Sequence, residues 1–134
     1  MANAFYSLWK QELLQGSTNT SLGGTIKACL IDTATYTYSA AHQFRSSLTG
    51  VATGTQPTLA SKTFVNGLFD AADTTFTAVG AGATVEAIVL YVDSGAAATD
   101  RLIAFIDSFT SGMPATPNGG DIVTAWNASG IFQL

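Results

Sequence analysis

The sequence is poor in the residues that most often carry chemistry. Among its 134 residues it has one cysteine, Cys29, and one histidine, His42. A single cysteine excludes an intramolecular disulfide, so stability must come from packing. One histidine and one cysteine cannot supply the usual nitrogen and sulfur ligands of a zinc site. We therefore expect no metal and no cofactor.

Charge is scarce as well. Charged residues make up 10% of the chain, and the formal net charge is −4, whereas soluble domains usually carry about 25% charged residues. The cations are scattered along the sequence: Lys10, Lys27, Arg45, Lys62 and Arg101. Without a basic cluster to neutralise phosphates, we expect no nucleic-acid partner. So few charges suit a surface partly covered by a partner, and they equally suit a β domain that exposes Thr and Ser hydroxyls.

Long apolar runs are absent. The longest, Ala87 to Val92, is far too short to span a bilayer, so we expect no membrane insertion. The first 16 residues lack a basic region followed by an apolar core, and they carry Lys10 and Glu12 where such a core would lie. We therefore expect no secretory signal. The chain is expected to be made in a cytosol and kept there, or assembled there into something larger.

Short segments with strand character are abundant. They are residues 25–32, 62–69, 74–79, 85–92 and 101–107, and residues 122–134 close the chain as two short strands or one bent one. Six to eight strands separated by turn signals, without alternating helices, predict a mainly β fold. We expect an antiparallel, jelly-roll-like β-sandwich with one N-terminal α-helix. No repeat or boundary is visible, so residues 1–134 are predicted to form a single domain.

The N-terminal segment is predicted as a helix over residues 3–15. Asn3 can cap its start, and Gly16 can end it in the left-handed conformation. Its apolar residues follow the spacing of one helical face: Phe5, Leu8, Trp9 and Leu13. Further along, Ser39 could cap a short helix that runs through Leu48, and residues 49–61 are predicted as an exposed loop with one short strand.

The runs at 85–92 and 101–107 carry apolar residues at both odd and even positions. A sandwich strand with one face in water should alternate apolar and polar residues instead. Both faces of these strands must therefore be covered. The N-terminal helix can provide the cover within the chain, which we favour, or a neighbouring subunit can, and both can hold together.

Catalytic patterns are weak. Ser39 lies three residues before His42, yet no G-x-S-x-G elbow is present, and a surface imidazole is the preferred interpretation. A glycosidase pair would need a second carboxyl group across a cleft from Glu12 or Glu86, which the sequence alone does not provide. We expect that the protein is not an enzyme.

Aspartates gather at 70 and 73 and around the loop between the two apolar runs: Asp70, Asp73, Asp93, Asp100 and Asp107. Their oxygens could bind calcium, but their spacing does not match the D-x-D-x-D-G loop. The preferred interpretation is that Asp70 and Asp73 cap turns and that the others are solvated charges at strand ends.

Aromatic residues offer an alternative function. Five of them could stack on a sugar, as in carbohydrate-binding β-sandwiches: Trp9, Trp126, Tyr36, Tyr38 and Tyr91. Trp9 lies on the apolar stripe of the predicted helix, so core packing is favoured for that residue.

Five segments together resemble a family of small proteins encoded by tailed bacteriophages. They are residues 3–14 (NAFYSLWKQELL), 36–44 (YTYSAAHQF), 59–79 (LASKTFVNGLFDAADTTFTAV), 85–107 (VEAIVLYVDSGAAATDRLIAFID) and 116–134 (TPNGGDIVTAWNASGIFQL). The resemblance covers nearly the whole chain and rests on fold-pattern residues.

The resemblance implies a virion component, most simply a capsid decoration or cement protein that stabilises the head shell. Its expected partners are the major capsid protein or other virion proteins, with homo-oligomers on the shell. Its expected location is the virion, after synthesis in the host cytoplasm. The alternative is a tail- or fibre-associated module that binds the host surface or a glycan, and a small hydrolase is the least favoured hypothesis.

A cement protein needs an apolar surface to bury against its shell. The predicted interface residues belong to the N-terminal helix and the C-terminal segment: Phe5, Tyr6, Trp9, Ile131, Phe132 and Leu134. The flexible loop 49–61 is a further candidate. The alternative for all three regions is ordinary core and loop.

Overall fold

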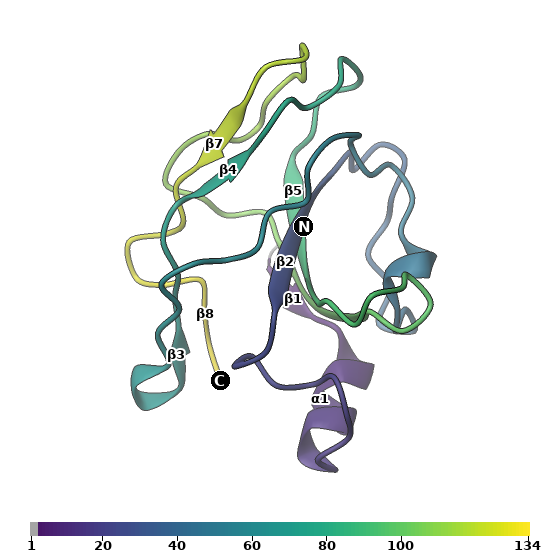
Figure 1. Ribbon diagram of the computed structural model, residues 1–134, viewed down its shortest axis with the longest axis vertical. Helices are drawn as coiled ribbons and strands as arrows, with labels where there is room; N and C mark the ends of the chain where they lie inside the picture. Colours follow the sequence, from purple (N-terminus) through teal and green to yellow (C-terminus); the bar gives the residue numbers. More distant parts are fainter. Residues whose placement is uncertain (1–2) are drawn as a thin grey trace.

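The computed structural model describes residues 3–134, and within this range the fold is mainly β with one α-helix (Figure 1). The helix is α1 (Ser7–Leu14), and two 3-10 turns are η1 (Arg45–Ser47) and η2 (Val65–Gly67). The strands are β1 (Ala4–Phe5), β2 (Ile26–Ile31), β3 (Leu68–Phe69), β4 (Thr74–Phe76), β5 (Ala87–Val92), β6 (Arg101–Ile106), β7 (Ile122–Thr124) and β8 (Phe132–Gln133). The predicted β class and single helix are confirmed.

The strands form one four-stranded sheet and two small ribbons. The sheet has the order β1-β6-β5-β2, and the ribbons pair β3 with β8 and β4 with β7. Every pair is antiparallel, as predicted. The sheets are small and do not close on themselves. The three longest strands, β2, β5 and β6, lie where the sequence predicts them.

One face of the sheet is covered by the segment that follows β2. Cys29 pairs with Val89 and Val89 pairs with Phe105, so these three side chains share a face. The rings of Tyr36 and Tyr38 lie against Phe105, with centroid distances of 6.5 and 6.1 Å. Residues 33–48 therefore place an aromatic layer over this face.

The C-terminal part of the chain covers the opposite face. Phe5 pairs with Ala104, and its ring meets Phe132 of β8 edge to face at a centroid distance of 4.8 Å. Phe132 in turn packs against Phe69 of β3 at 5.0 Å. All six residues of β5 are consequently buried. The cover comes from within the chain, as we favoured, but most of it is not the helix: α1 lies below the start of β2, at one end of the molecule (Figure 1).

The helix is shorter than the sequence predicts, because Ala4 and Phe5 pair with β6 rather than with the next helical turn. Asn3 does not cap the helix. Its Oδ1 accepts hydrogen bonds from the N–H groups of Asp107 and Ser108 instead. The predicted end at Gly16 is confirmed. Gly16 has φ +70°, and the N–H groups of Gly16 and Ser17 donate to the carbonyls of Leu13 and Glu12, which is a Schellman cap.

The predicted helix from Ser39 to Leu48 is wrong, and only the turn η1 forms there. The backbone of this segment pairs with the edge of β6 instead: Leu102 N–H donates to the Gln43 carbonyl, and Arg45 N–H donates to the Asp100 carbonyl. Likewise the predicted strand at 62–69 is reduced to η2 and the two residues of β3.

Residues 49–61 are not simply an exposed loop. Thr58 forms a bridge with Lys27, and Val51 forms one with Ile31, so this segment runs along the outer edge of β2. Leu59 is buried. On the other side of the sheet the carbonyl of Phe5 accepts the Tyr38 hydroxyl at 2.5 Å. The edges of the central sheet are thus paired or blunted within the chain.

Within the described range, no helix combines the length and the apolar character needed to cross a membrane.

Candidate functional site

An apolar groove is lined by residues of α1, of the loop after it, of the loop before β3 and of the C-terminus. These segments lie toward the lower end of the molecule in Figure 1. We call this groove the end groove. Its volume is about 340 Å³, and it is lined by Leu13, Ser21, Leu22, Gly23, Phe64 and Leu134. Phe64 is 47% exposed and Leu134 57% exposed, and Leu14 at the helix end is 89% exposed. Large apolar side chains that cluster on a surface typically mark a contact site.

Two features hold the walls of the end groove. The cap at Gly16 ends α1 and turns the chain back toward the loop that contains Leu22. Lys62 then ties this loop to the other wall, because its Nζ donates to the Leu22 carbonyl at 2.8 Å and also to the Gly24 carbonyl. Burial lowers the pKa of Lys62.

The six predicted interface residues are distributed unevenly. Tyr6, Trp9 and Ile131 are in the core, with exposures of 0%, 1% and 5%. Phe5 and Phe132 are half-buried and contact each other. Leu134 is exposed and lines the end groove. The structure thus places Leu134 beside Leu13, Leu22 and Phe64, which the interface prediction did not include.

A chain of buried hydroxyls leads to the histidine. The hydroxyls of Tyr6 and Tyr36 are 2.8 Å apart, and the Tyr36 hydroxyl lies 2.8 Å from His42 Nδ1. Burial raises the pKa of both tyrosines. Ser39 Oγ accepts a hydrogen bond from Ala41 N–H. The imidazole is thus engaged with a tyrosine and not with the serine that a hydrolase would use.

One aspartate was misjudged from the sequence. Asp100 is not a solvated charge, because it is fully buried. Its Oδ2 accepts a hydrogen bond from Arg45 Nε at 2.7 Å, and its Oδ1 accepts from the N–H of Ser94 at 2.7 Å and the hydroxyl of Ser94 at 2.9 Å. Arg45 lies over the Tyr91 ring at 5.0 Å. Asp100 therefore fixes the β5–β6 loop to the segment that covers the sheet.

The remaining acidic residues do not converge. Asp70 Oδ1 accepts the N–H of Ala71, as a turn residue does. Hydrogen bonding from Gly95 N–H, and then from Lys27, lowers the pKa of Asp93. Among residues 3–134, no group of three or more His, Cys, Asp or Glu side chains could hold a metal ion.

The aromatic side chains considered for sugar stacking are mostly inside the molecule. Trp9, Tyr36, Tyr91 and Trp126 are at most 5% exposed. Tyr38 is half-buried, and its hydroxyl is bound to the Phe5 carbonyl. These five residues do not form an exposed stacking surface.

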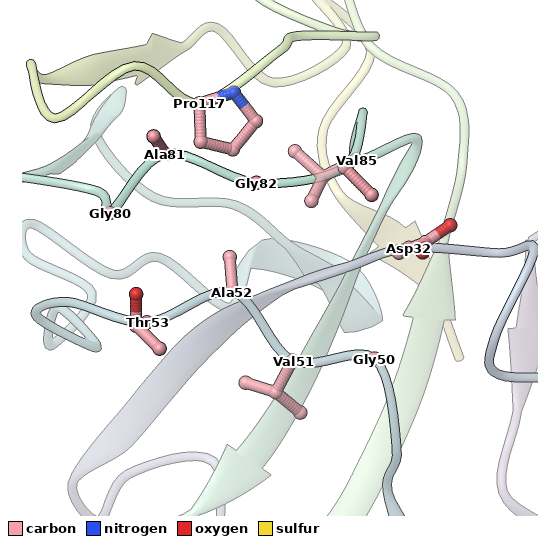
Figure 2. A pocket seen from close by; sticks show the side chains of 11 residues that line it. Asp32, Gly50, Val51, Ala52, Thr53, Gly80, Ala81, Gly82, Val85 and Pro117 are labelled. Atoms are coloured by element: carbon pink, nitrogen blue, oxygen red, sulfur yellow. The ribbon is translucent and has the colours of Figure 1, made fainter.

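A second hollow, which we call the edge cleft, lies between residues 50–53 and residues 80–83 (Figure 2). Its volume is about 200 Å³, and Asp32, Val85 and Pro117 complete its lining. The signal that could have indicated it is the glycine- and alanine-rich stretch from Gly80 to Ala83, where a chain without bulky side chains leaves space open.

No model of a known protein family matches this chain, and no curated protein matches it either.

Proposed function

We propose that the protein is a structural component of a tailed-bacteriophage particle, a capsid decoration or cement protein that binds the head shell through non-covalent contacts. It carries out no reaction, it takes no cofactor, and several copies assemble on each shell. The observation that carries the proposal is the end groove, where the exposed side chains of Phe64 and Leu134 join Leu13 and Leu22 in an apolar surface on a rigid β scaffold.

The rest of the molecule supports this assignment, because the end groove is an exposed apolar surface while the central sheet is buried. The central sheet is buried on both faces, so β5 and β6 serve as scaffold and not as contact surface. The low charge of the chain reduces the cost of desolvating a surface against a shell. The end groove then offers side chains that gain free energy when they leave water.

The same proposal includes the way in which the two ribbons are arranged against the four-stranded sheet. The ribbons β3–β8 and β4–β7 are the second layer of a jelly-roll-like sandwich, with the four-stranded sheet as the first layer. The contact between Phe5 and Phe132 supports this arrangement, because it joins β1 to β8. An experimental structure in which the ribbons pack away from the sheet contradicts it.

The test is cosedimentation with purified heads of the phage that encodes the chain. We expect stoichiometric recovery with heads, and heads that lack the protein should lose resistance to heat and to osmotic shock. Recovery with detached tails instead of heads contradicts the cement function.

A matched pair of variants tests the end groove. Leu134→Lys places a charge in the groove at a residue that is 57% exposed, whereas Val123→Lys changes another exposed apolar residue, 55% exposed, on strand β7. Leu134→Lys should weaken head binding at least tenfold, and Val123→Lys should leave it unchanged, while neither alters the folded spectrum. Equal binding by both variants contradicts a role for the groove.

A further inference from the structure

The edge cleft separates two segments that are joined at one end. At the closed end, Gly80 N–H donates to the Thr53 carbonyl at 3.1 Å. From there the segments 50–53 and 80–83 run side by side, and the opposite end of the cleft reaches Asp32 (Figure 2). The cleft is therefore a slot that lies along the outer edge of the strand-like segment 50–53.

On the lower wall of this slot, which is formed by residues 50–53, the backbone N–H and C=O groups of one residue have no hydrogen-bond partner among residues 3–134. Ala52 N–H donates to the Leu30 carbonyl, and Asp32 N–H donates to the Gly50 carbonyl. Val51 and Ile31 between them form a non-hydrogen-bonded antiparallel pair. In such a pair the N–H and C=O groups of each residue point away from the partner strand. Those of Val51 therefore point outward, and no residue of the described chain pairs with them.

The backbone on the upper side of the slot forms its hydrogen bonds with the segment that contains Ala115 and Pro117. Val85 and Ala115 exchange two hydrogen bonds of 2.8 and 3.0 Å, and Gly82 N–H donates to the Pro117 carbonyl at 3.4 Å. This wall thus pairs with the segment beyond it and leaves the Val51 groups open. An extended strand that enters the slot can satisfy them.

The size and lining of the slot limit what can enter. Its volume of about 200 Å³ is below the range of roughly 300–1,000 Å³ that is usual for small-molecule sites. A single turn of a helix, about 10 Å across and 5.4 Å long, occupies more than this volume. The Ala52 methyl group points toward Gly82, so the walls are small enough for another backbone to approach (Figure 2). The slot suits an extended backbone with small side chains.

The negative charge at the Asp32 end of the slot favours an occupant with a positive charge there. Asp32 is held in place because its Oδ1 accepts Ala34 N–H at 2.9 Å and its Oδ2 accepts the Thr35 hydroxyl at 3.0 Å. Glu86 Oε2 accepts the N–H of Thr33, the next residue in the chain, at 2.9 Å, which adds a second negative charge to this turn. The residues that line the cleft include no lysine or arginine. A cation on the occupant is therefore favoured at this end.

We propose that the edge cleft binds an extended segment of a partner protein. One residue of that segment pairs with Val51 as an added strand, small side chains fill the slot, and a lysine or arginine lies toward Asp32. This is β-strand addition at a sheet edge, in which main-chain hydrogen bonds give affinity and the flanking side chains give specificity. The site is separate from the end groove and does not depend on the proposed function.

The test uses the full chain labelled with ¹⁵N and pools of capped hexapeptides made from Ala, Ser, Thr and Val, with Lys or Glu at either end. Lys pools should shift the amide resonances of Val51 and Ala52 in a saturable way, and Glu pools should bind at least tenfold more weakly. The same Lys peptides with N-methylated backbones cannot pair with Val51, so they should also bind at least tenfold more weakly.

Two variants complete the test. Ala52→Leu fills the slot and should reduce peptide binding at least tenfold, whereas Thr55→Leu adds the same side chain at an exposed position that does not line the cleft and should have no effect. The N-methylated peptides test the same contact on the unmodified protein, so the result does not depend on how Ala52→Leu folds.

Three outcomes overturn the proposal. The first is that no pool shifts the Val51 amide at millimolar concentration. The second is that N-methylated and unmodified peptides bind equally well. The third is that monosaccharides shift these amides while peptides do not, which would make the cleft a sugar site.

Discussion

At the scale of single residues, most buried polar side chains have dedicated partners, and the exceptions among residues 3–134 are Arg101 Nη1 and Thr124 Oγ1. Asp100 receives three hydrogen bonds, and the hydroxyl of Tyr6 is joined to that of Tyr36. Buried polar groups cost free energy unless they are paired, so each of these side chains also specifies where its partner segment must lie. For Asp100 that partner segment is the turn that begins at Arg45.

Asp100→Asn should destabilise the protein by about 2–4 kcal/mol. The substitution keeps the shape but removes the charge that Arg45 Nε and Ser94 bind, and it leaves buried donors without a good acceptor. Asp93→Asn, in the same loop, is the control. It weakens a partly exposed ion pair with Lys27 and should cost less than about 1 kcal/mol. Urea unfolding of both variants gives the comparison, and equal losses would show that Asp100 has no special role.

At the scale of elements, long strands could be predicted from the sequence and short ones could not. β2, β5 and β6 consist mostly of apolar residues, and the burial of these residues decides their structure. In contrast, Ala4 and Phe5 fit a helical stripe equally well, and they form a strand because β6 offers them a free edge. Such tertiary pairing overrides local propensity and leaves no mark in the local pattern. The segment from Ser39 to Leu48 was mispredicted for the same reason.

The candidate sites depend even more on distant contacts. Leu13, Leu22, Phe64 and Leu134 are far apart in the sequence, and nothing in their spacing indicates one groove. The interface prediction rests on apolar residues of the N-terminal helix and of the C-terminal segment, and the fold uses three of them, Tyr6, Trp9 and Ile131, in its core. Of the six residues in that prediction, Leu134 is the one that is exposed and lines the end groove.

Gly16→Ala tests the element boundary that the sequence did predict. Gly16 has φ +70°, and an added Cβ would meet no atom within 4 Å, so its cost is purely conformational. We expect a loss of about 1–2 kcal/mol. Gly82→Ala is the control, since Gly82 has no positive φ and its added Cβ would come no closer than 3.8 Å to Gly80 O. It should be neutral or slightly stabilising. Thermal unfolding of the two variants distinguishes these expectations.

At the scale of the whole molecule, the buried thiol and the buried tyrosine hydroxyls together determine how the free energy of unfolding changes at high pH. Burial raises the pKa of the Cys29 thiol to about 12 from an ordinary value of 9.0. Burial likewise raises the pKa of Tyr6, Tyr36 and Tyr91 above their ordinary value. Each of these groups keeps its proton in the folded protein at a pH where the unfolded chain has lost it. The folded state is therefore favoured less and less as the pH rises.

We expect the free energy of unfolding to be independent of these groups below about pH 9 and to fall above it. The slope is about 1.4 kcal/mol per pH unit for each proton that the folded state retains and the unfolded state releases, first from Cys29 and then from the tyrosines. Urea unfolding between pH 8 and 10.5 measures it. Cys29→Ala should reduce the slope between pH 9 and 10, and an unchanged slope in that variant contradicts the assignment.

The pairing of the sheet edges has a consequence for crowding. Proteins with β-sheets often rely on like-charge repulsion to stay apart at high concentration, and this chain has few charges for that purpose. Its safeguard against fibrillar stacking is instead steric, because residues 50–59 shield one border of the sheet except at the single position of Val51, and residues 43–45 shield the other. Many copies can therefore be packed closely together, even at high salt concentration, without their sheets joining edge to edge.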